Sequence, residues 1–390
     1  MPPDDAGAKL LEAARALAPR IRACVAETDR ARRLPEPLVQ ELVAAGLYRM
    51  FLPHALGGFE LPPLAYFDVV EELTRADSAV GWSILISTSS MTSMLRGLPD
   101  AVVADMFTSP RRTIVMGSAP PKGRAVAADG GYRVTGRWTQ GSNILIAGWV
   151  QVGCIVHDGA EPRRGPDGRV EQRLVSLPAT EADVFDTWDT TGMRGTGSHD
   201  FGFTDRFVPE ARTHVAGRPS ARPGPLYQFP GWTHVAHAAL GLGIARVAME
   251  AFLDLAAGKR ATWLPAEGDL AGRGTIQARV AEAEALVGAG RAYVRERLAD
   301  MWETVCAGAA PSPAQRATYR LAIAHAMANA VAAVDLLYRA AGASAIYASS
   351  PLDRCLRDAH TAQAHVWVAP DTYEIAGRLL LGLDPGTPTI

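Results

Sequence analysis

The chain has 390 residues, 48% of them hydrophobic, which is enough for a large core and two or three structural units. Its 39 basic and 41 acidic residues leave a net charge of −2, which excludes a strongly basic surface for nucleic acid or for an anionic membrane. The four cysteines lie far apart without CxxC spacing, which argues against a zinc site or a disulfide framework and favours a reducing cytoplasm.

The N-terminal stretch carries acids and arginines among its apolar positions, unlike a signal peptide. No uncharged run reaches the roughly 20 residues of a membrane-spanning helix. We therefore expect a soluble, cytoplasmic protein.

Residues 1–110 predict an N-terminal helical domain. Apolar residues recur at intervals of three and four over 6–33, 34–48 and 64–74. Residues 80–98 are nearly uncharged and rich in small side chains, which is typical of a buried helix. Between the second and third of these stretches, prolines and paired glycines predict a loop.

Residues 111–212 predict a middle β-barrel or sandwich domain of roughly seven strands, because short alternating or β-branched runs are separated by Gly, Pro and Asp clusters. Asp129, Gly130 and Gly131 predict a tight hairpin turn, since such turns need positive φ. After a Pro/Gly-rich connector, residues 213–390 return to long helical patterns. These cover 234–259, 275–306 and 313–341, with a last helix ending near Leu381, and they predict a C-terminal four-helix bundle. The fold class is therefore mostly α with a central β domain.

Some short stretches place hydroxyls beside glycines. Ser118 and Ser142 both do so, and such backbone and hydroxyl donors can approach a flat ring closely. The alternative is an ordinary hairpin turn. Three glycines surround Arg194 and Ser198, but they lie between strands and not in the strand–GxGxxG–helix context of a Rossmann site.

The closing stretch, residues 351–382, concentrates charged and imidazole side chains near a chain end. Chain ends fray unless something holds them, so this concentration suggests a terminus that docks into a site, and a solvated helix surface is an equal alternative on composition alone.

The order helices, β domain, four-helix bundle resembles the acyl-CoA dehydrogenase fold over essentially the whole chain. Four motifs carry the resemblance in the expected order: PHALGG, VTGRWTQGS, the loop GMRGTGSHD with the strand that follows it, and LRDAHTA.

The resemblance implies a flavin site. It places Ser142, Trp138, Ser118, Arg194 and Ser198 among the cofactor-binding residues, although a strand tryptophan is often simply a core residue. It also implies that Arg260, at a helix end, binds a flavin phosphate across a subunit boundary, since its fork of donors suits phosphate, and that the chain forms a homotetramer. A solvent-facing arginine is the alternative for Arg260.

The closing stretch separates the branches of this fold. Acyl-CoA dehydrogenases usually carry a catalytic glutamate after R-D-A, whereas an ungapped comparison puts Val366 there and His365 before it. RDAHTAQAH is more similar to the two-component flavin-dependent monooxygenases, in which a histidine matching His365 lies by the flavin's oxygen adduct. An imidazole can hold or pass a proton, so His365 is the predicted catalytic residue, together with Ser142. His360 is assigned a lesser, orienting role.

The sequence therefore predicts the oxygenase component of a flavin-dependent monooxygenase. It would use O₂ and reduced FMN or FAD, supplied by a separate NAD(P)H:flavin reductase, to oxygenate a small aromatic or heteroaromatic substrate through a hydroperoxyflavin. The predicted substrate pocket lies between the N-terminal helices and the bundle and is lined by Trp82, Ser90, Met91 and Met94. Two alternatives are an acyl-CoA dehydrogenase with a relocated base and a non-catalytic flavin-fold subunit.

Overall fold

The computed structural model describes residues 3–165, 167–215, 217–220, 222–258 and 269–386. Their contacts divide the chain into two compact units. The first contains Met1–Ala65, Trp82–Thr190 and Arg194–Thr233, and the second contains Tyr66–Gly81, Thr191–Met193 and His234–Ile390. The predicted boundaries near residues 110 and 212 mark where helices give way to strands and back, whereas these units follow spatial contacts.

In its described residues, the first unit contains three helices that follow the predicted periodicity and two short ones. They are α1 (Pro3–Ala31), α2 (Glu36–Ala44), α4 (Ser78–Gly97, in this unit from Trp82 on), α5 (Asp100–Met106) and α6 (Pro225–Gln228). Leu10, Ala14 and Ile21 of α1 are buried, as their spacing predicted. Helices α5 and α6 were not predicted, because seven and four residues are too few for a clear periodic signal.

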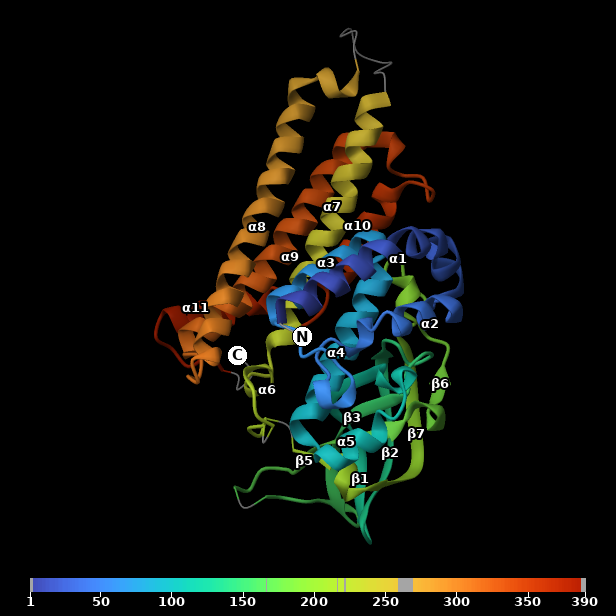
Figure 1. Cartoon of the computed structure of the whole chain (residues 1–390), viewed down its shortest axis with the longest axis vertical. Helices are drawn as coiled ribbons and strands as arrows, with labels where there is room; N and C mark the ends of the chain where they lie inside the picture. The colour runs from blue at the N-terminus through green and yellow to red at the C-terminus, as the bar shows by residue number, and fades with distance from the viewer. Residues whose placement is uncertain (1–2, 166, 216, 221, 259–268, 387–390) are drawn as a thin grey trace. The chain divides into compact units, whose positions relative to one another are not determined.

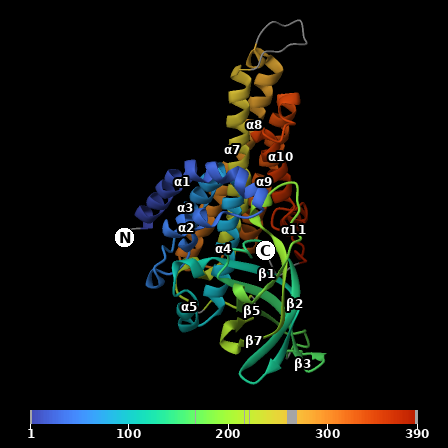
Figure 2. The same ribbon diagram turned by 90° about the vertical axis from the view of Figure 1, so that its right-hand side faces the viewer.

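The first unit also contains one mixed sheet. Its strands are β1 (Val115–Ala128), β2 (Gly131–Gly141), β3 (Trp149–Asp158), β4 (Glu161–Pro162), β5 (Gln172–Pro178), β6 (Asp183–Phe185), β7 (His199–Pro209) and β8 (Thr213–His214). Figure 2 labels strands β1, β2, β3, β5 and β7. The order is β6-β7-β2-β1-β3-β5-β8, with β4 paired to β3. The predicted hairpin joins β1 to β2, with Gly130 at φ 73°.

The sheet does not close into the predicted barrel. Its edge strands β6 and β8 have three and two residues, so neither is long enough to pair across the opening. One face carries the apolar core, which includes Val150, Val152 and Cys154 of β3. Helices lie on the other face: Trp149 Nε1 donates to Met106 O of α5 at 2.8 Å, and α4 packs against β1 at Gly117.

The second unit is built on a helical bundle, in which α7, α8 and α9 run side by side (Figure 1). Its helices are α3 (Pro63–Ala76, in this unit from Tyr66 on), α7 (Val235–Gly258), α8 (Gly274–Cys306), α9 (Pro313–Ala341), α10 (Pro351–Gln363) and α11 (Asp371–Leu380). Ser312 and Gln315 form a capping box at the start of α9, the position at which the sequence predicted this helix to begin. In the described part of the chain, Pro313–Ser344 is the one stretch apolar and long enough to span a membrane, and 61% of its most apolar window is buried inside the protein.

The predicted last helix is broken in two. Helix α10 ends at Gln363 and α11 begins at Asp371, after Pro370, because proline cannot donate the backbone hydrogen bond that a continuous helix needs. Residues 364–370, between the two helices, form turns and bends. His365 lies in this segment, which places it on a turn and not on a helix face.

Candidate active site

In the first unit, helix α4 meets the loop that follows β2 through two consecutive residues on each side. Trp82 Nε1 donates to Ser142 Oγ at 3.0 Å, and Ser83 Oγ donates to Asn143 Oδ1 at 2.6 Å. Asn143 Nδ2 donates back to Ser83 O at 2.8 Å. Asn143 adopts a φ of 72°, a left-handed conformation that asparagine tolerates better than most residues. The loop is therefore held by both side-chain and backbone contacts.

The hydroxyl chain continues to the loop before β7. Ser142 Oγ lies 2.7 Å from Ser198 Oγ, which lies 2.7 Å from Thr196 Oγ1. Asn143 N donates to Thr196 O at 3.2 Å, so backbone also joins the two loops. The structure thus brings together Trp82, Ser142 and Ser198, three residues that the sequence predicted separately. A hydroxyl offers one donor and two acceptor positions, so this chain retains capacity for a ligand.

Ser118 and Ser90 both adjoin Gly117, Ser118 as the next residue of β1 and Ser90 on the facing helix α4. Ser118 is half-buried in β1, at the start of the irregularity that separates the β1–β3 registers at Ser118 and Gly123. Its neighbour Gly117 faces α4, where an added Cβ would lie 2.4 Å from Ser90 Oγ. Ser90 Oγ itself donates to Ile86 O at 2.8 Å. Glycine is therefore required at 117 for α4 to lie this close to the sheet.

Three other predicted site residues are packed inside the first unit. Met91 and Met94 of α4 are fully buried. Trp138 is also fully buried in the β core, where it stacks on Phe201 at a centroid distance of 5.7 Å and donates from Nε1 to Gly153 O at 3.2 Å. This burial assigns all three side chains a packing role, and we leave them out of the site proposed below.

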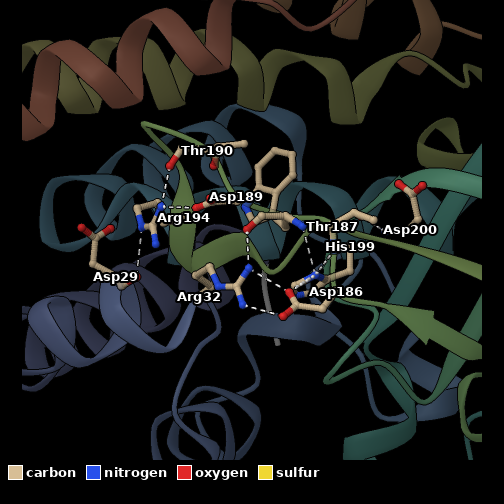
Figure 3. Close-up of polar contacts among 10 residues, drawn as sticks. Asp29, Arg32, Asp186, Thr187, Asp189, Thr190, Arg194, His199 and Asp200 are labelled. Carbon is tan, nitrogen blue, oxygen red and sulfur yellow. Dashed lines mark hydrogen bonds and ion pairs between the residues drawn. The ribbon is translucent and has the colours of Figure 1, made fainter.

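Arg194 fastens its loop to the N-terminal helix (Figure 3). It donates from Nε to Asp29 O at 3.3 Å and from one terminal nitrogen to Asp189 Oδ1 at 3.2 Å and to Thr190 O at 2.7 Å. These contacts give the predicted cofactor residue a structural role in the chain itself. The other predicted cation, Arg260, lies outside the described residues.

His199, which follows this loop, was missed by the sequence analysis. Its Nδ1 accepts hydrogen bonds from the backbone N of Thr187 and Trp188, each at 3.2 Å, and Arg32 pairs with Asp186 beside it (Figure 3). Burial lowers the pKa of His199 below its ordinary value, an effect that nearby Asp186 only partly opposes. The imidazole is therefore neutral and serves as an acceptor.

We expect His199→Ala to lower the free energy of unfolding at pH 7.5 by about 1–2 kcal/mol, because two backbone donors lose their acceptor. The folded pKa lies below the unfolded value of 6.5, so the unfolded chain binds a proton first as the pH falls. Wild-type stability then declines below about pH 6.5, and the difference from the variant shrinks. Denaturant titrations at pH 7.5 and 5.0 measure both effects. His157→Ala, in β3, is the control, and an equal loss in both variants would contradict the assignment.

In the second unit, the R-D-A motif of α10 forms a buried polar network. Asp358 accepts from Ser78 Oγ at 2.5 Å and from Met193 N at 2.6 Å, and it pairs with Arg354 at 3.4 Å. Arg354 also donates to Asp77 at 2.8 Å. Burial raises the pKa of the Asp77 carboxyl, and the charge of Arg354 opposes this rise. The network ties α10 to the segment Thr191–Met193.

His365 stacks on His237 of α7, with ring centroids 4.5 Å apart. Burial lowers the pKa of His365 to about 4, and burial together with His365 lowers the pKa of His237 well below its ordinary value. Trp367 N lies 3.4 Å from His365 Nδ1 and donates to it, so the proton of the neutral ring resides on Nε2. His237 Nδ1 in turn donates to His234 O at 3.1 Å. His365 is thus a neutral hydrogen-bond donor through Nε2.

Aromatic contacts extend this pair. His234 stacks on Trp367 with centroids 3.5 Å apart, and Arg320 Cζ lies 4.6 Å from the centre of the same indole. The sequence analysis did not single out His234 and His237. The sequence signal that could have identified them is their spacing of three residues at the start of a helix, which places both side chains on one face.

The other residues of the closing stretch that the sequence analysis considered lie outside this histidine cluster. His360 pairs with Asp335 at 2.9 Å and is half exposed, so it acts at the bundle surface. Residue 366 is an exposed valine, and Glu374 is exposed on α11. In the described closing stretch, neither position offers a buried carboxylate base.

Comparison with known proteins agrees with this chemistry. Residues 5–98 match the family model described as acyl-CoA dehydrogenase, N-terminal domain, and residues 235–370 match acyl-CoA dehydrogenase, C-terminal domain. The chain is 33% identical to indole-3-acetate monooxygenase of Pseudomonas putida over 94% of its length and 92% of that protein. The chain belongs to the flavin-dependent monooxygenases of the acyl-CoA dehydrogenase fold. The predicted family and enzyme class are confirmed.

Other members of this monooxygenase family are similar over their full lengths. The chain is 28% identical to the oxygenase subunit HsaA of Mycobacterium tuberculosis over 95% of its length and 94% of that protein. The structure of XiaF from a Streptomyces species, a complex with FADH2 and glycerol, matches with a TM-score of 0.91 and 25% identity, covering 100% of this chain and 98% of that one. The predicted fold and the predicted reduced-flavin cofactor are confirmed at the level of the family.

The residues of the first unit fit a flavin. A flavin presents a flat ring with polar edges, and the unit places the Trp82 indole in direct contact with linked hydroxyls of Ser142 and Ser198. Ser118, half-buried on β1, adds a further hydroxyl. Such neutral donors and acceptors match the ring edges without introducing an unpaired charge.

Proposed function

We propose that this chain is the oxygenase component of a two-component system that oxygenates an indole or a related small aromatic substrate. A separate NAD(P)H:flavin reductase would supply reduced FMN or FAD. The relatives support the substrate class, since two of them are named indole-3-acetate monooxygenase and another is the oxygenase component of a resorcinol hydroxylase. The resorcinol hydroxylase relative is named as one component of its enzyme system, which also supports a separate reductase as partner.

The observation that carries the proposal is the neutral His237–His365 pair. An acyl-CoA dehydrogenase needs a carboxylate to remove a proton from its substrate, whereas His365, with a pKa of about 4, is uncharged at neutral pH and has its proton on Nε2. A neutral N–H donor can stabilise a developing negative charge on oxygen through a hydrogen bond. This is the requirement of oxygen chemistry and not of thioester deprotonation.

The other residues would bind and orient. Reduced flavin, when bound, supplies the electrons that activate O₂. Ser142, Ser198 and Ser118 would hold its polar edge, while Trp82 and Ser90 would face the substrate.

A homotetramer is also part of the proposal. Helix α11 and the residues after it expose Leu380 at 65%, Leu381 at 77% and Leu383 at 51% of their surface. Adjacent exposed leucines of this size are typical of a protein interface. Light scattering coupled to gel filtration is expected to give the mass of four chains, and a monomeric mass would contradict this point.

The activity test combines the purified chain with a flavin reductase, NADH, FMN or FAD, and indole-3-acetate under ¹⁸O₂. We expect one ¹⁸O atom in the product, detected by mass spectrometry, and no product without the reductase. A parallel anaerobic sample receives oxidised flavin and octanoyl-CoA without reductase. Bleaching of the flavin in that sample would show a dehydrogenase instead. Absence of ¹⁸O from both indole-3-acetate and resorcinol would overturn the proposed substrate class.

A further inference from the structure

A row of three residues crosses the sheet of the first unit on the face opposite its apolar core. Gly117 of β1 is the register partner of Gln151 in β3, and Gln151 is the partner of Ser176 in β5. Their neighbours Val150, Val152 and Val175 belong to the core. Because side chains alternate along a strand, Gln151 and Ser176 point to the other face, side by side.

Each of these buried polar side chains has one polar atom without a hydrogen-bond partner. Gln151 is 3% exposed and Ser176 is 1% exposed, and in the described part of the chain neither Gln151 Nε2 nor Ser176 Oγ makes a hydrogen bond. Nearby, His214 of β8 pairs with Leu174 and also has a buried Nδ1 without a hydrogen-bond partner. Buried donors without partners are rare in folded proteins because each loses its bonds to water, so a cluster of them indicates that a ligand completes the set.

The row ends at β1, where helix α4 covers it. Gly117 and Ser118 are half-buried, whereas Gln151 and Ser176 lie further across the sheet. Ser90 of α4 lies over Gly117, close enough that any side chain at 117 would collide with its hydroxyl. The two unpartnered donors therefore lie on the sheet face that α4 covers, and Gln151 is one strand away from the position beneath Ser90, a predicted substrate residue.

We propose that Gln151 and Ser176 bind the oxygen-bearing substituent of the aromatic substrate and so determine which substrates are accepted. The amide N–H and the hydroxyl are neutral donors, and their complement is an acceptor oxygen such as that of a carboxylate or carbonyl side chain. This inference rests on the proposed function, since it assigns the far end of the same substrate. The aromatic ring would lie nearer to Ser90 and Trp82.

The test compares two probes that differ in the substituent oxygens, indole-3-acetate and 3-methylindole. Dissociation constants are measured by calorimetry for the wild type, Gln151→Met, Ser176→Ala and the double variant, in the presence of FMN or FAD. We expect the double variant to bind indole-3-acetate about tenfold to hundredfold more weakly, with 3-methylindole unchanged. Gln172→Met, at an exposed position of the same β3–β5 strand pair, is the matched control and is expected to leave both constants unchanged.

A second measurement does not depend on flavin or activity. If the Ser176 hydroxyl has no partner until a ligand binds, Ser176→Ala removes an unsatisfied buried group. The free energy of unfolding of the ligand-free variant is then expected to equal or exceed that of the wild type. Lower ligand-free stability would indicate an internal water only and would overturn the inference. Equal weakening of both probes would overturn it too. Normal ¹⁸O incorporation into the indole ring by the double variant, with unchanged affinity for indole-3-acetate, would refute this inference while leaving the proposed function intact.

Discussion

Replacement of His365 by alanine is expected to lower the rate of product formation by a factor of about 10²–10⁴, the usual contribution of a positioned proton donor. The variant should still consume oxygen, but release it mainly as hydrogen peroxide, because the Nε2 proton no longer stabilises the reacting oxygen. The ratio of product to oxygen consumed, from an oxygen electrode and chromatography, measures the effect. His365→Gln keeps a side-chain N–H and is expected to recover part of the ratio.

His360→Ala is the matched control. It lies on the preceding helix and pairs with Asp335 at the bundle surface, so it should leave the product ratio unchanged. Since the pKa of His365 is about 4, its contribution should also stay constant from pH 8 down to pH 5.5 and be lost only below that. A product ratio in His365→Ala equal to the wild-type ratio would show that the histidine is merely structural.

Replacement of Asp358 by alanine is expected to reduce the apparent free energy of unfolding by about 3–5 kcal/mol. The change leaves Arg354 without one of its carboxylates and removes the acceptor of both Ser78 Oγ and Met193 N, all within a buried network. Chemical denaturation followed by circular dichroism measures the loss.

Asp353→Ala supplies the comparison for this second variant. Asp353 pairs with Arg357 at 2.9 Å on the same helix, one turn apart and partly exposed. Such a pair contributes about 0.3–0.5 kcal/mol, so the two variants should differ several-fold in their effect. Similar losses in both would mean that the Asp358 network adds little beyond an ordinary surface ion pair.

Much of the architecture was predictable because its signals are local. Helical spacing located α7, α8 and α9 to within a residue or two, and a Gly-Gly turn located the β1–β2 hairpin. Closure of the sheet was not predictable, since it depends on how short the edge strands β6 and β8 become when the chain packs. The break between α10 and α11 carried a signal in Pro370, which the helical periodicity on either side obscured.

The candidate site was predictable in its residue types and only partly in its members. Ser142, Ser198 and Trp82 were each predicted, but from motifs far apart in the chain, and their hydrogen bonds became visible only in the fold. Trp138 shows the opposite outcome. Its motif resembles a flavin-contacting segment, but the alternation of side chains along β2 places the Trp138 indole in the apolar core of the sheet.

Neighbouring residues were enough to predict the order of helices and strands, the family, and the presence of Val366 where acyl-CoA dehydrogenases carry their catalytic glutamate. Only the folded chain shows that His237 stacks on His365, with burial keeping both imidazoles neutral, and that Gln151 and Ser176 share a buried row. Such pairs come from distant segments, and their contacts depend on helix packing and strand register. A pKa or an unpartnered donor depends on those surroundings, so it exists only in the folded chain.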